Sequence, residues 1–223
     1  MISHHPHEGM LIEYANGSLP AAGSLLVASH ASMCGECQCR IADFETIGAA
    51  LMDSIDEAPI DGTSLRSVLD RIDGLADETA TVADEKSAPA ALDEETLGLV
   101  PPPLRPLLTG SLTSLQWRRI GRGLRRAALG TYGSGKVSLI EIRPGGSVPA
   151  HTHTGDEYTL VLQGAFHDET GEYATGDVAY ADPDLDHRPR ASSDGPCLCL
   201  TIEGGPVRLT GPVGRVLNRV VKG

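Results

Sequence analysis

The sequence of 223 residues is poor in aromatic side chains and has no long hydrophobic run. It contains Phe 2, Trp 1 and Tyr 5, so aliphatic side chains must fill the cores that a hydrophobic content of 40% allows. No apolar segment reaches the roughly 18 residues that a membrane-spanning helix needs. The first ten residues, MISHHPHEGM, lack the basic start and apolar stretch of a signal peptide. These absences argue against a membrane span and predict a cytoplasmic protein.

Basic residues are scarce in the first half of the chain. Residues 1–110 carry 5 Lys and Arg against 18 Asp and Glu, whereas residues 111–223 carry 13 against 12. Such asymmetry indicates that the two halves have different partners. The acidic half lacks the basic patches that bind nucleic acid directly, and it suits a partner with a basic surface, such as a protein that binds DNA or RNA polymerase. The alternative is that the acidic charge serves solubility alone.

The cysteines are too few and too unevenly placed for a disulfide framework. The chain has five of them and no export signal. Three, Cys34, Cys37 and Cys39, fall within six residues and close to His30. This crowding predicts a metal site.

Apolar residues in the first 76 positions recur at helical spacing. Met10, Leu11 and Tyr14 predict a short helix, and a second helix is expected from Pro20 to about Met33. Two further apolar stripes predict a third and a fourth helix, the latter with Thr63 or Ser64 as its N-cap: Ile41, Phe44, Gly48 and Leu51, then Leu65, Val68, Leu69 and Ile72. Residues 1–76 are therefore expected to form a small helical domain.

The rest of the chain changes character twice. Residues 77–110 are rich in Ala, Pro and acidic residues, which predicts a linker that stiffens at its prolines. From residue 111 to 223, short apolar segments alternate with turn residues, as in a β-sandwich or barrel. The strands expected there are Val137–Ile142, Tyr158–Leu162, Val178–Ala181 and Cys197–Ile202. The predicted fold is a helical domain, a linker and an all-β domain.

His30, Cys34 and Cys37 have the spacing of metal ligands. If the second helix continues through His30, Cys34 lies four residues on along the same face, and Cys37 lies on that face or just past the helix end. Zinc favours this mixture of imidazole and thiolate, and a closed structural site needs a fourth protein ligand. A histidine in MISHHPHEGM can supply it. The alternative is that the cysteines only pack in a core; Cys39 is expected to be a non-ligand.

A second set of donors follows in the expected barrel. His151 and His153 point to the same face of a strand because they are two residues apart, Glu157 opens the next strand, and His187 can complete the set. Imidazoles and a carboxylate suit Zn, Fe, Mn, Ni or Cu; a second divalent metal, with zinc as the first choice, is expected. The spacing Gly145-x5-His151-x-His153-x3-Glu157-x6-Gly164 is similar to the first motif of the cupin family, whereas the second motif is matched only in part because Leu185 stands where glycine is common. The alternative is a cupin that has lost its metal.

The His30-x3-Cys34-x2-Cys37 motif and the segment from Leu11 to Leu19 resemble the ChrR-type zinc-binding anti-sigma factors. By this resemblance the upstream zinc ligand is His5, with His4 and His7 as alternatives. The resemblance also implies a four-helix unit that clamps between the two conserved regions of a group IV (extracytoplasmic-function) sigma factor and inhibits it in a 1:1 complex. The cupin, a double-stranded β-helix barrel, would then be needed for release in response to singlet oxygen or related oxidants, and the protein would not be an enzyme.

Two other functions fit part of the sequence. One is a cupin metalloenzyme, of the dioxygenase or isomerase type, with a helical oligomerisation domain; the other is a metal-storage or metal-sensing protein. The enzyme hypothesis leaves the motif at His30 unexplained. Arginines around Trp117 are expected at a solvated rim or against the acidic half. Cys197 and Cys199 share a strand face, so core packing is expected, with a redox role as the alternative.

Overall fold

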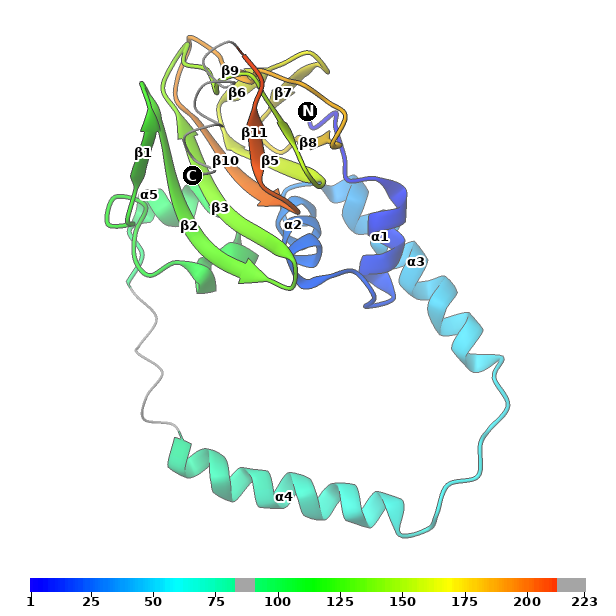
Figure 1. Cartoon of the computed structure of the whole chain (residues 1–223). Helices are drawn as coiled ribbons and strands as arrows, with labels where there is room; N and C mark the ends of the chain where they lie inside the picture. The colour runs from blue at the N-terminus through cyan, green and yellow to red at the C-terminus, as the bar shows by residue number, and fades with distance from the viewer. Residues whose placement is uncertain (83–90, 212–223) are drawn as a thin grey trace.

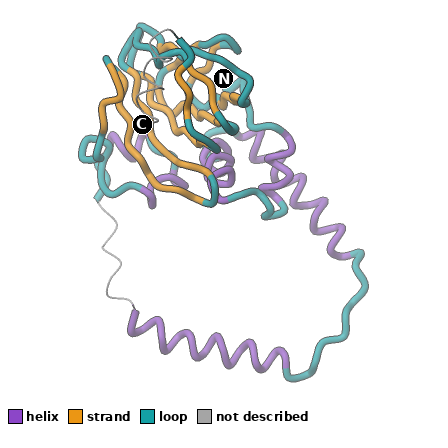
Figure 2. Tube along the Cα trace, viewed as in Figure 1, coloured by secondary structure: helices purple, strands orange, loops and turns teal. Residues whose placement is uncertain are grey.

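The helices lie along one side of a β-sheet domain, except for one helix that stands apart (Figure 1 and Figure 2). The computed structural model describes residues 1–82 and 91–211. The helices are α1 (Glu8–Ala15), α2 (Ala21–Ala31), α3 (Gly35–Asp53), α4 (Ser64–Val82) and α5 (Glu94–Leu99), followed by a 3-10 helix at Pro102–Leu107. No helix among these residues combines the length and apolarity needed to cross a bilayer.

The strands form three sheets. They are β1 (Arg118–Gly121), β2 (Leu124–Tyr132), β3 (Gly135–Ile142), β4 (His151–His153), β5 (Glu157–Gln163), β6 (Ala165–His167), β7 (Glu172–Ala174), β8 (Val178–Ala181), β9 (Arg190–Ala191), β10 (Cys197–Glu203) and β11 (Val207–Leu209). Their orders are β1-β2-β3-β10-β5-β8, β7-β6-β9 and β11-β4, and the pairings are antiparallel. The four strands expected from the sequence are confirmed as β3, β5, β8 and β10. The domain order of helices followed by a cupin-like β domain is also as predicted.

Strand β10 is buried along its whole length because both faces of its sheet are covered. On the inner face, Cys199 belongs to a core that includes Val161 and Phe166. On the outer face, Leu200 belongs to a second core that includes Leu26 and other residues of the helices. Because successive side chains point to opposite faces of a strand, β10 contributes residues to both cores.

Helix α2 provides most of the helical side of the outer core. Its sequence, AAGSLLVASHA, contains no Asp, Glu, Lys or Arg, and Leu26, Val27 and His30 are fully buried. The helix approaches β3 so closely that a Cβ on Gly135 would lie 2.6 Å from the Cβ of Ala22. A helix that is apolar on all sides needs such burial, and here the cupin sheet provides it.

The structure differs from the expected linker at residues 77–110 because both ends of that segment are helical. Helix α4 continues to Val82, and Asp93 caps α5 by accepting a hydrogen bond of 2.9 Å from the backbone N–H of Thr96. Val100 and Leu104 are then buried in the outer core with α2. The prolines therefore form a short helix that packs, rather than a spacer; positions 83–90 of the expected linker lie outside the described residues.

The helical part is compact only at its beginning. Ile41 of α3 is buried and Phe44 is half-buried, but every residue of α3 after Phe44 is exposed. Residues 65–74 of α4 are all exposed as well, and α4 lies away from the rest of the molecule (Figure 1). The expected apolar stripes of the third and fourth helices thus exist, but most of their length faces solvent.

Leu104 tests whether residues 94–107 belong to the folded core. We expect Leu104→Ala to lower the free energy of unfolding by about 2–5 kcal/mol, because it leaves a cavity at a fully buried position. The control is Leu97→Ala, at a leucine of α5 that is 43% exposed, which should cost no more than about 0.5 kcal/mol. Chemical denaturation measures both; equal small effects would restore the linker interpretation.

Candidate functional site

The first predicted donor set converges at the junction of α2, α3 and the N-terminal segment. One ligand atom from each of His5, His30, Cys34 and Cys37 lies within 4.8 Å of the others. The distances are 3.2 Å from His30 Nε2 to Cys37 Sγ, 3.3 Å from His5 Nδ1 to Cys37 Sγ, and 3.5 Å from His5 Nδ1 to Cys34 Sγ. The edges of a tetrahedron around zinc with nitrogen and sulfur ligands measure about 3.3–3.8 Å, so the geometry fits that ion.

The helix boundaries that produce this convergence differ from the expected ones. α2 ends at Ala31, Cys34 is the N-cap residue of α3, and Cys37 lies in the first turn of α3. His30 and Cys34 therefore do not share one continuous helix face. The chain bends between them, and the bend directs both side chains to one point.

The structure also distinguishes the three candidate histidines before α1. His5 faces the two cysteines, whereas Nδ1 of His4 lies 3.6 Å from Asp177 Oδ2. His7 is the N-cap residue of α1, and its Nδ1 accepts a hydrogen bond of 3.2 Å from the backbone N–H of Gly9. Cys39 is exposed. The geometry thus brings together the four residues named from the sequence and leaves the alternatives outside.

The protonation chemistry of this set suits a cation. Nδ1 of His30 donates to the backbone oxygen of Gly176 at 2.8 Å, which leaves Nε2 as the free electron-pair donor that faces Cys37. Burial lowers the pKa of His30, so the imidazole is neutral, as a metal ligand must be. Burial and the neighbouring Cys34 raise the pKa of Cys37 to about 12. Two thiolates so close together need a positive charge between them, and a metal ion supplies it.

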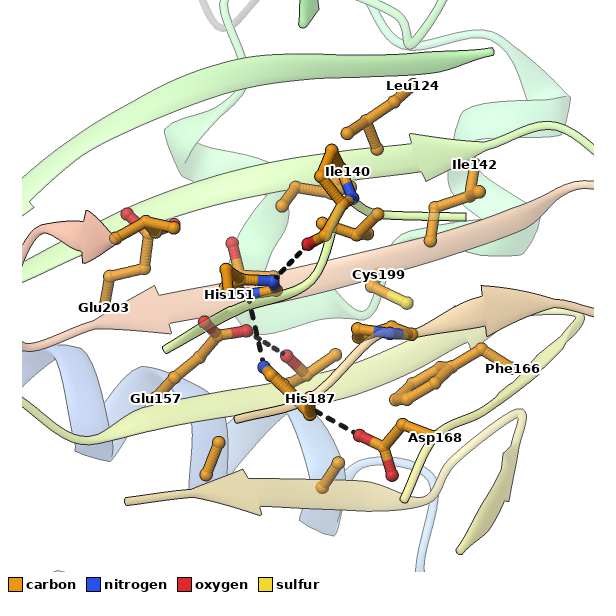
Figure 3. Close-up of a pocket in the computed structure, with 18 of the residues that line it drawn as sticks. Leu124, Ile140, Ile142, His151, Glu157, Phe166, Asp168, His187, Cys199 and Glu203 are labelled. Atoms are coloured by element: carbon orange, nitrogen blue, oxygen red, sulfur yellow. Dashed lines mark hydrogen bonds and ion pairs between the residues drawn. The ribbon is translucent and has the colours of Figure 1, made fainter. Parts of the chain in front are cut away.

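The second predicted donor set lies inside the cupin barrel. His151, His153, Glu157 and His187 again offer ligand atoms within 4.8 Å of one another. Nε2 of His187 is 3.2 Å from Nε2 of both His151 and His153, and Oε2 of Glu157 is 2.8 Å from Nε2 of His153. The two histidines of β4, the first residue of β5 and His187, in the loop before β9, thus form one centre. Figure 3 labels three of the four: His151, Glu157 and His187.

Neighbouring acceptors orient two of these imidazoles. Nδ1 of His151 donates to the backbone oxygen of Pro149 at 2.8 Å, and Nδ1 of His187 donates to Asp168 Oδ2 at 2.9 Å. Each bond leaves Nε2 free to bind a metal, which is the usual arrangement around metal-bound histidine. The sequence analysis did not identify Asp168. Its only signal was the turn that it begins, because its partner is 19 residues away along the chain.

Opposing effects set the charge of the cupin donors. Burial lowers the pKa of His151. Burial acts on His153 in the same direction, but the hydrogen bond with Glu157 outweighs it and the net pKa is raised. Burial would raise the pKa of Glu157, yet the bond to His153 and the nearby imidazoles lower it. The carboxylate is therefore ionised, and together with three imidazoles it makes a donor mixture that suits a divalent transition metal.

A mostly apolar cavity of about 340 Å³ opens beside the cupin donors. Figure 3 shows His151, Glu157 and His187 on one side of it and Phe166, Cys199 and Ile142 on the other. Cys197 and Cys199 are both buried, with their Sγ atoms 3.5 Å apart. The contact with Cys197 and burial raise the pKa of Cys199, so its thiol is neutral and packs in the barrel core, as expected.

Two of the arginines near Trp117 form ion pairs within the cupin. Arg125 pairs with Glu141 at 2.6 Å and lies 4.5 Å from the centre of the Trp117 ring. Arg126 pairs with Glu203 at 2.8 Å. These two guanidinium groups are thus partnered by carboxylates, which favours the interpretation of a rim over that of a nucleic-acid surface.

Together these features define a class of protein: a helical unit with a His2Cys2 donor set, packed on a cupin with a His3Glu donor set. A family model described as the ChrR cupin-like domain matches residues 108–207. The anti-sigma-E factor ChrR of Cereibacter sphaeroides is 37% identical over 207 residues, which cover 93% of this chain and 92% of that protein. The crystal structure of Rhodobacter sphaeroides SigE in complex with the anti-sigma ChrR matches with a TM-score of 0.73 and 34% identity, covering 91% of this chain and 99% of that one. The chain belongs to the family of ChrR anti-sigma factors.

Metal analysis of purified variants tests the two sites separately. We expect about two metal equivalents in the unaltered protein, one for each donor set. Cys34→Ser combined with Cys37→Ser should remove one equivalent, because it removes both thiolates from the helical set. His187→Ala should remove the other.

Cys39→Ser is the matched control for the cysteine variant, since Cys39 is an exposed cysteine of the same segment. It should retain both equivalents. Elemental analysis by mass spectrometry gives the metal identity and the count. An unaltered protein with a single equivalent, or a cysteine variant that keeps two, would contradict the assignment.

Proposed function

We propose that the chain binds a group IV (extracytoplasmic-function) sigma factor through its helical half and blocks access of that sigma factor to core RNA polymerase. One observation carries the proposal: a row of large apolar side chains on α3, on α4 and in the segment between them is exposed, in a chain whose relative is an anti-sigma factor. The exposed residues are Ile47, Leu51, Met52, Ile55, Ile60, Leu65, Val68, Leu69 and Ile72, with exposed fractions from 50% to 78%.

The arrangement of this row, called here the α3–α4 apolar row, indicates a protein partner. Ile47 and Leu51 are four residues apart on α3, and Leu65, Val68, Leu69 and Ile72 follow the three- and four-residue spacing of one α4 face. Exposure of such an apolar helix face to water is energetically unfavourable. Exposed apolar patches of this kind mark interaction sites. The row therefore supports a helix-mediated complex.

The charge around the row indicates what kind of partner it is. Residues 1–82 carry 3 Lys and Arg against 13 Asp and Glu, so the partner surface should be basic, and complementary charge would accelerate association. A sigma factor, which must contact DNA, has that character. The match to a chain solved in complex with SigE over 91% of this chain supports the same partner.

For the cupin we propose a sensing role: its metal is needed for release of the sigma factor in response to singlet oxygen or related oxidants. The apolar cavity beside His151, Glu157 and His187 gives a small molecule access to the donor set. We propose zinc at both sites, a 1:1 complex with sigma in the cytoplasm, and no enzymatic turnover. The cupin fold also occurs in enzymes, so turnover of a small substrate by this chain would favour the metalloenzyme alternative.

The α3–α4 apolar row can be tested in the full-length protein. We expect Leu51→Glu and Leu69→Glu each to weaken binding to the cognate sigma factor by about 30-fold, because a buried apolar anchor is worth about 2 kcal/mol or more. Ser67→Glu is the matched control on the opposite face of α4 and should bind as the unaltered chain does. Calorimetry on purified pairs gives the affinities; equal affinity of all three variants would remove the row from the interface.

The sensing role predicts that a change at the cupin metal site reduces release of the sigma factor without changing the affinity for it. His187→Ala should keep affinity for sigma, because His187 lies in the barrel and not on α3 or α4. It should reduce oxidant-induced transcription of a sigma-dependent reporter by about tenfold if loss of the donor blocks the response. Asp184→Asn, an exposed residue of the same loop, serves as the control. A normal oxidant response in a variant that lacks the cupin metal would refute the sensing role.

A further inference from the structure

The N-terminal segment before α1 is fastened to a turn of the cupin. This turn, Ala174–Val178, joins β7 to β8, and residue Asp177 within it is 2% exposed. Oδ1 of Asp177 accepts hydrogen bonds from the backbone N–H groups of Ser3 at 2.7 Å and His4 at 2.9 Å. The backbone oxygen of His4 accepts from the N–H of Val178 at 3.0 Å. Three bonds thus hold the two residues that directly precede His5.

The same turn holds a second donor of the helical set. The backbone oxygen of Gly176 accepts the hydrogen bond from Nδ1 of His30. Gly176 has φ +94°, and a Cβ there would lie 2.5 Å from Cδ1 of Ile2, so glycine is required both by the backbone and by the close approach of Ile2. Two of the four side chains of the helical set, His5 and His30, are therefore positioned by cupin residues.

Backbone hydrogen bonds to β5 hold the turn in place. The N–H of Val161 donates to the oxygen of Asp177 at 3.0 Å, and the N–H of Gly176 donates to the oxygen of Val161 at 2.8 Å. β8 then pairs with β5 through four rungs, from Leu160 opposite Val178 to Glu157 opposite Ala181. The turn thus runs directly into β8, which pairs with β5, the strand that begins with the cupin donor Glu157.

We propose that Asp177 is a positioning residue for the metal site of the helices: by binding the N–H groups of Ser3 and His4 it keeps His5 in place and slows loss of the metal. The proposal rests on the metal site described above, but it does not depend on binding to a sigma factor. Outer residues that orient metal ligands typically change metal affinity by about 10–100-fold when they are replaced. The anchoring bonds come from the cupin, so the helical site is not autonomous.

Cobalt in the full-length protein provides a readout for this site alone. Thiolate ligands give Co²⁺ a charge-transfer absorption that the cupin set, which has no cysteine, cannot produce. We expect Asp177→Asn to lose this absorption about tenfold faster than the unaltered chain after addition of excess EDTA. An amide cannot accept from Ser3 and His4 on one side and from Ala174, at 2.9 Å, on the other. Glu172→Gln, at an exposed carboxylate of the adjoining β7, should release cobalt at the unaltered rate.

Asp177→Asn also loosens the turn itself, so a second pair of variants isolates the anchoring bond. Ser3→Pro removes the shorter of the two backbone N–H bonds to Asp177, the one from Ser3 at 2.7 Å, and replaces no residue of the cupin, whereas Ser3→Ala keeps that N–H. We expect rapid cobalt release from Ser3→Pro and the unaltered rate from Ser3→Ala, with the thermal midpoint and the cupin metal content unchanged in both. This pair also keeps the proposal testable if Asp177→Asn fails to fold.

The outcomes separate the hypotheses. Unaltered release from Ser3→Pro would overturn the proposal, even if Asp177→Asn released cobalt rapidly, because loss of the shorter anchoring bond would then leave the hold on His5 unchanged. Equal release from Ser3→Pro and Ser3→Ala would overturn it as well. Absence of the thiolate absorption in the unaltered chain would instead refute the metal site.

Discussion

The burial of α2 between α1, α3 and the cupin sheet is the constraint on which both halves of the molecule depend. Leu26 and Val27 on the helix and Leu139, Leu160 and Leu200 on the sheet have no exposed surface. To separate the halves would expose these side chains, at about 1.5–3 kcal/mol each, and would leave the Nδ1 of His30 without the oxygen of Gly176. The helical part and the cupin therefore form one folded unit, although the family model covers only residues 108–207.

The packing of α2 against the cupin sheet positions the helical donor set, and this set lies where α3 begins. Cys34 and Cys37 fix the start of α3, and the exposed half of the same helix carries Ile47 and Leu51. In the proposed function these residues meet sigma, so the direction of α3 relative to the cupin is set at the metal site. Asp177 accepts a hydrogen bond from the backbone N–H of His4, the residue before the donor His5, and it lies next to the end of the β5–β8 ladder. A chain of direct contacts thus links the barrel to the start of α3.

Local spacing in the sequence predicted seven of the eight donors and the main strands, because a motif such as His151-x-His153-x3-Glu157 depends on neighbours along the chain. His5 was named through the family resemblance, since spacing alone did not separate it from His4 and His7. The docking of α2 was missed, although its lack of charged residues was a usable signal for burial on all sides. The proline-rich run was interpreted as a spacer because composition does not show that Leu104 has a pocket to fill. Asp168 and Asp177 were missed for another reason. Their partners are 19 and 174 residues away, and no local pattern records such a contact.

The two donor sets differ in what surrounds them, and this difference supports a division of roles. The helical set consists of four protein donors that face one another, with the spacing of a closed tetrahedron. Such a site holds chain segments together and offers no position to a ligand. The cupin set borders a cavity of about 340 Å³, and its histidines are already oriented by Pro149 and Asp168. A small molecule that enters this cavity meets an arranged donor set. In the proposed function the cupin is therefore the part open to a chemical signal, and the closed set, where α3 begins, is the part that holds the helices together.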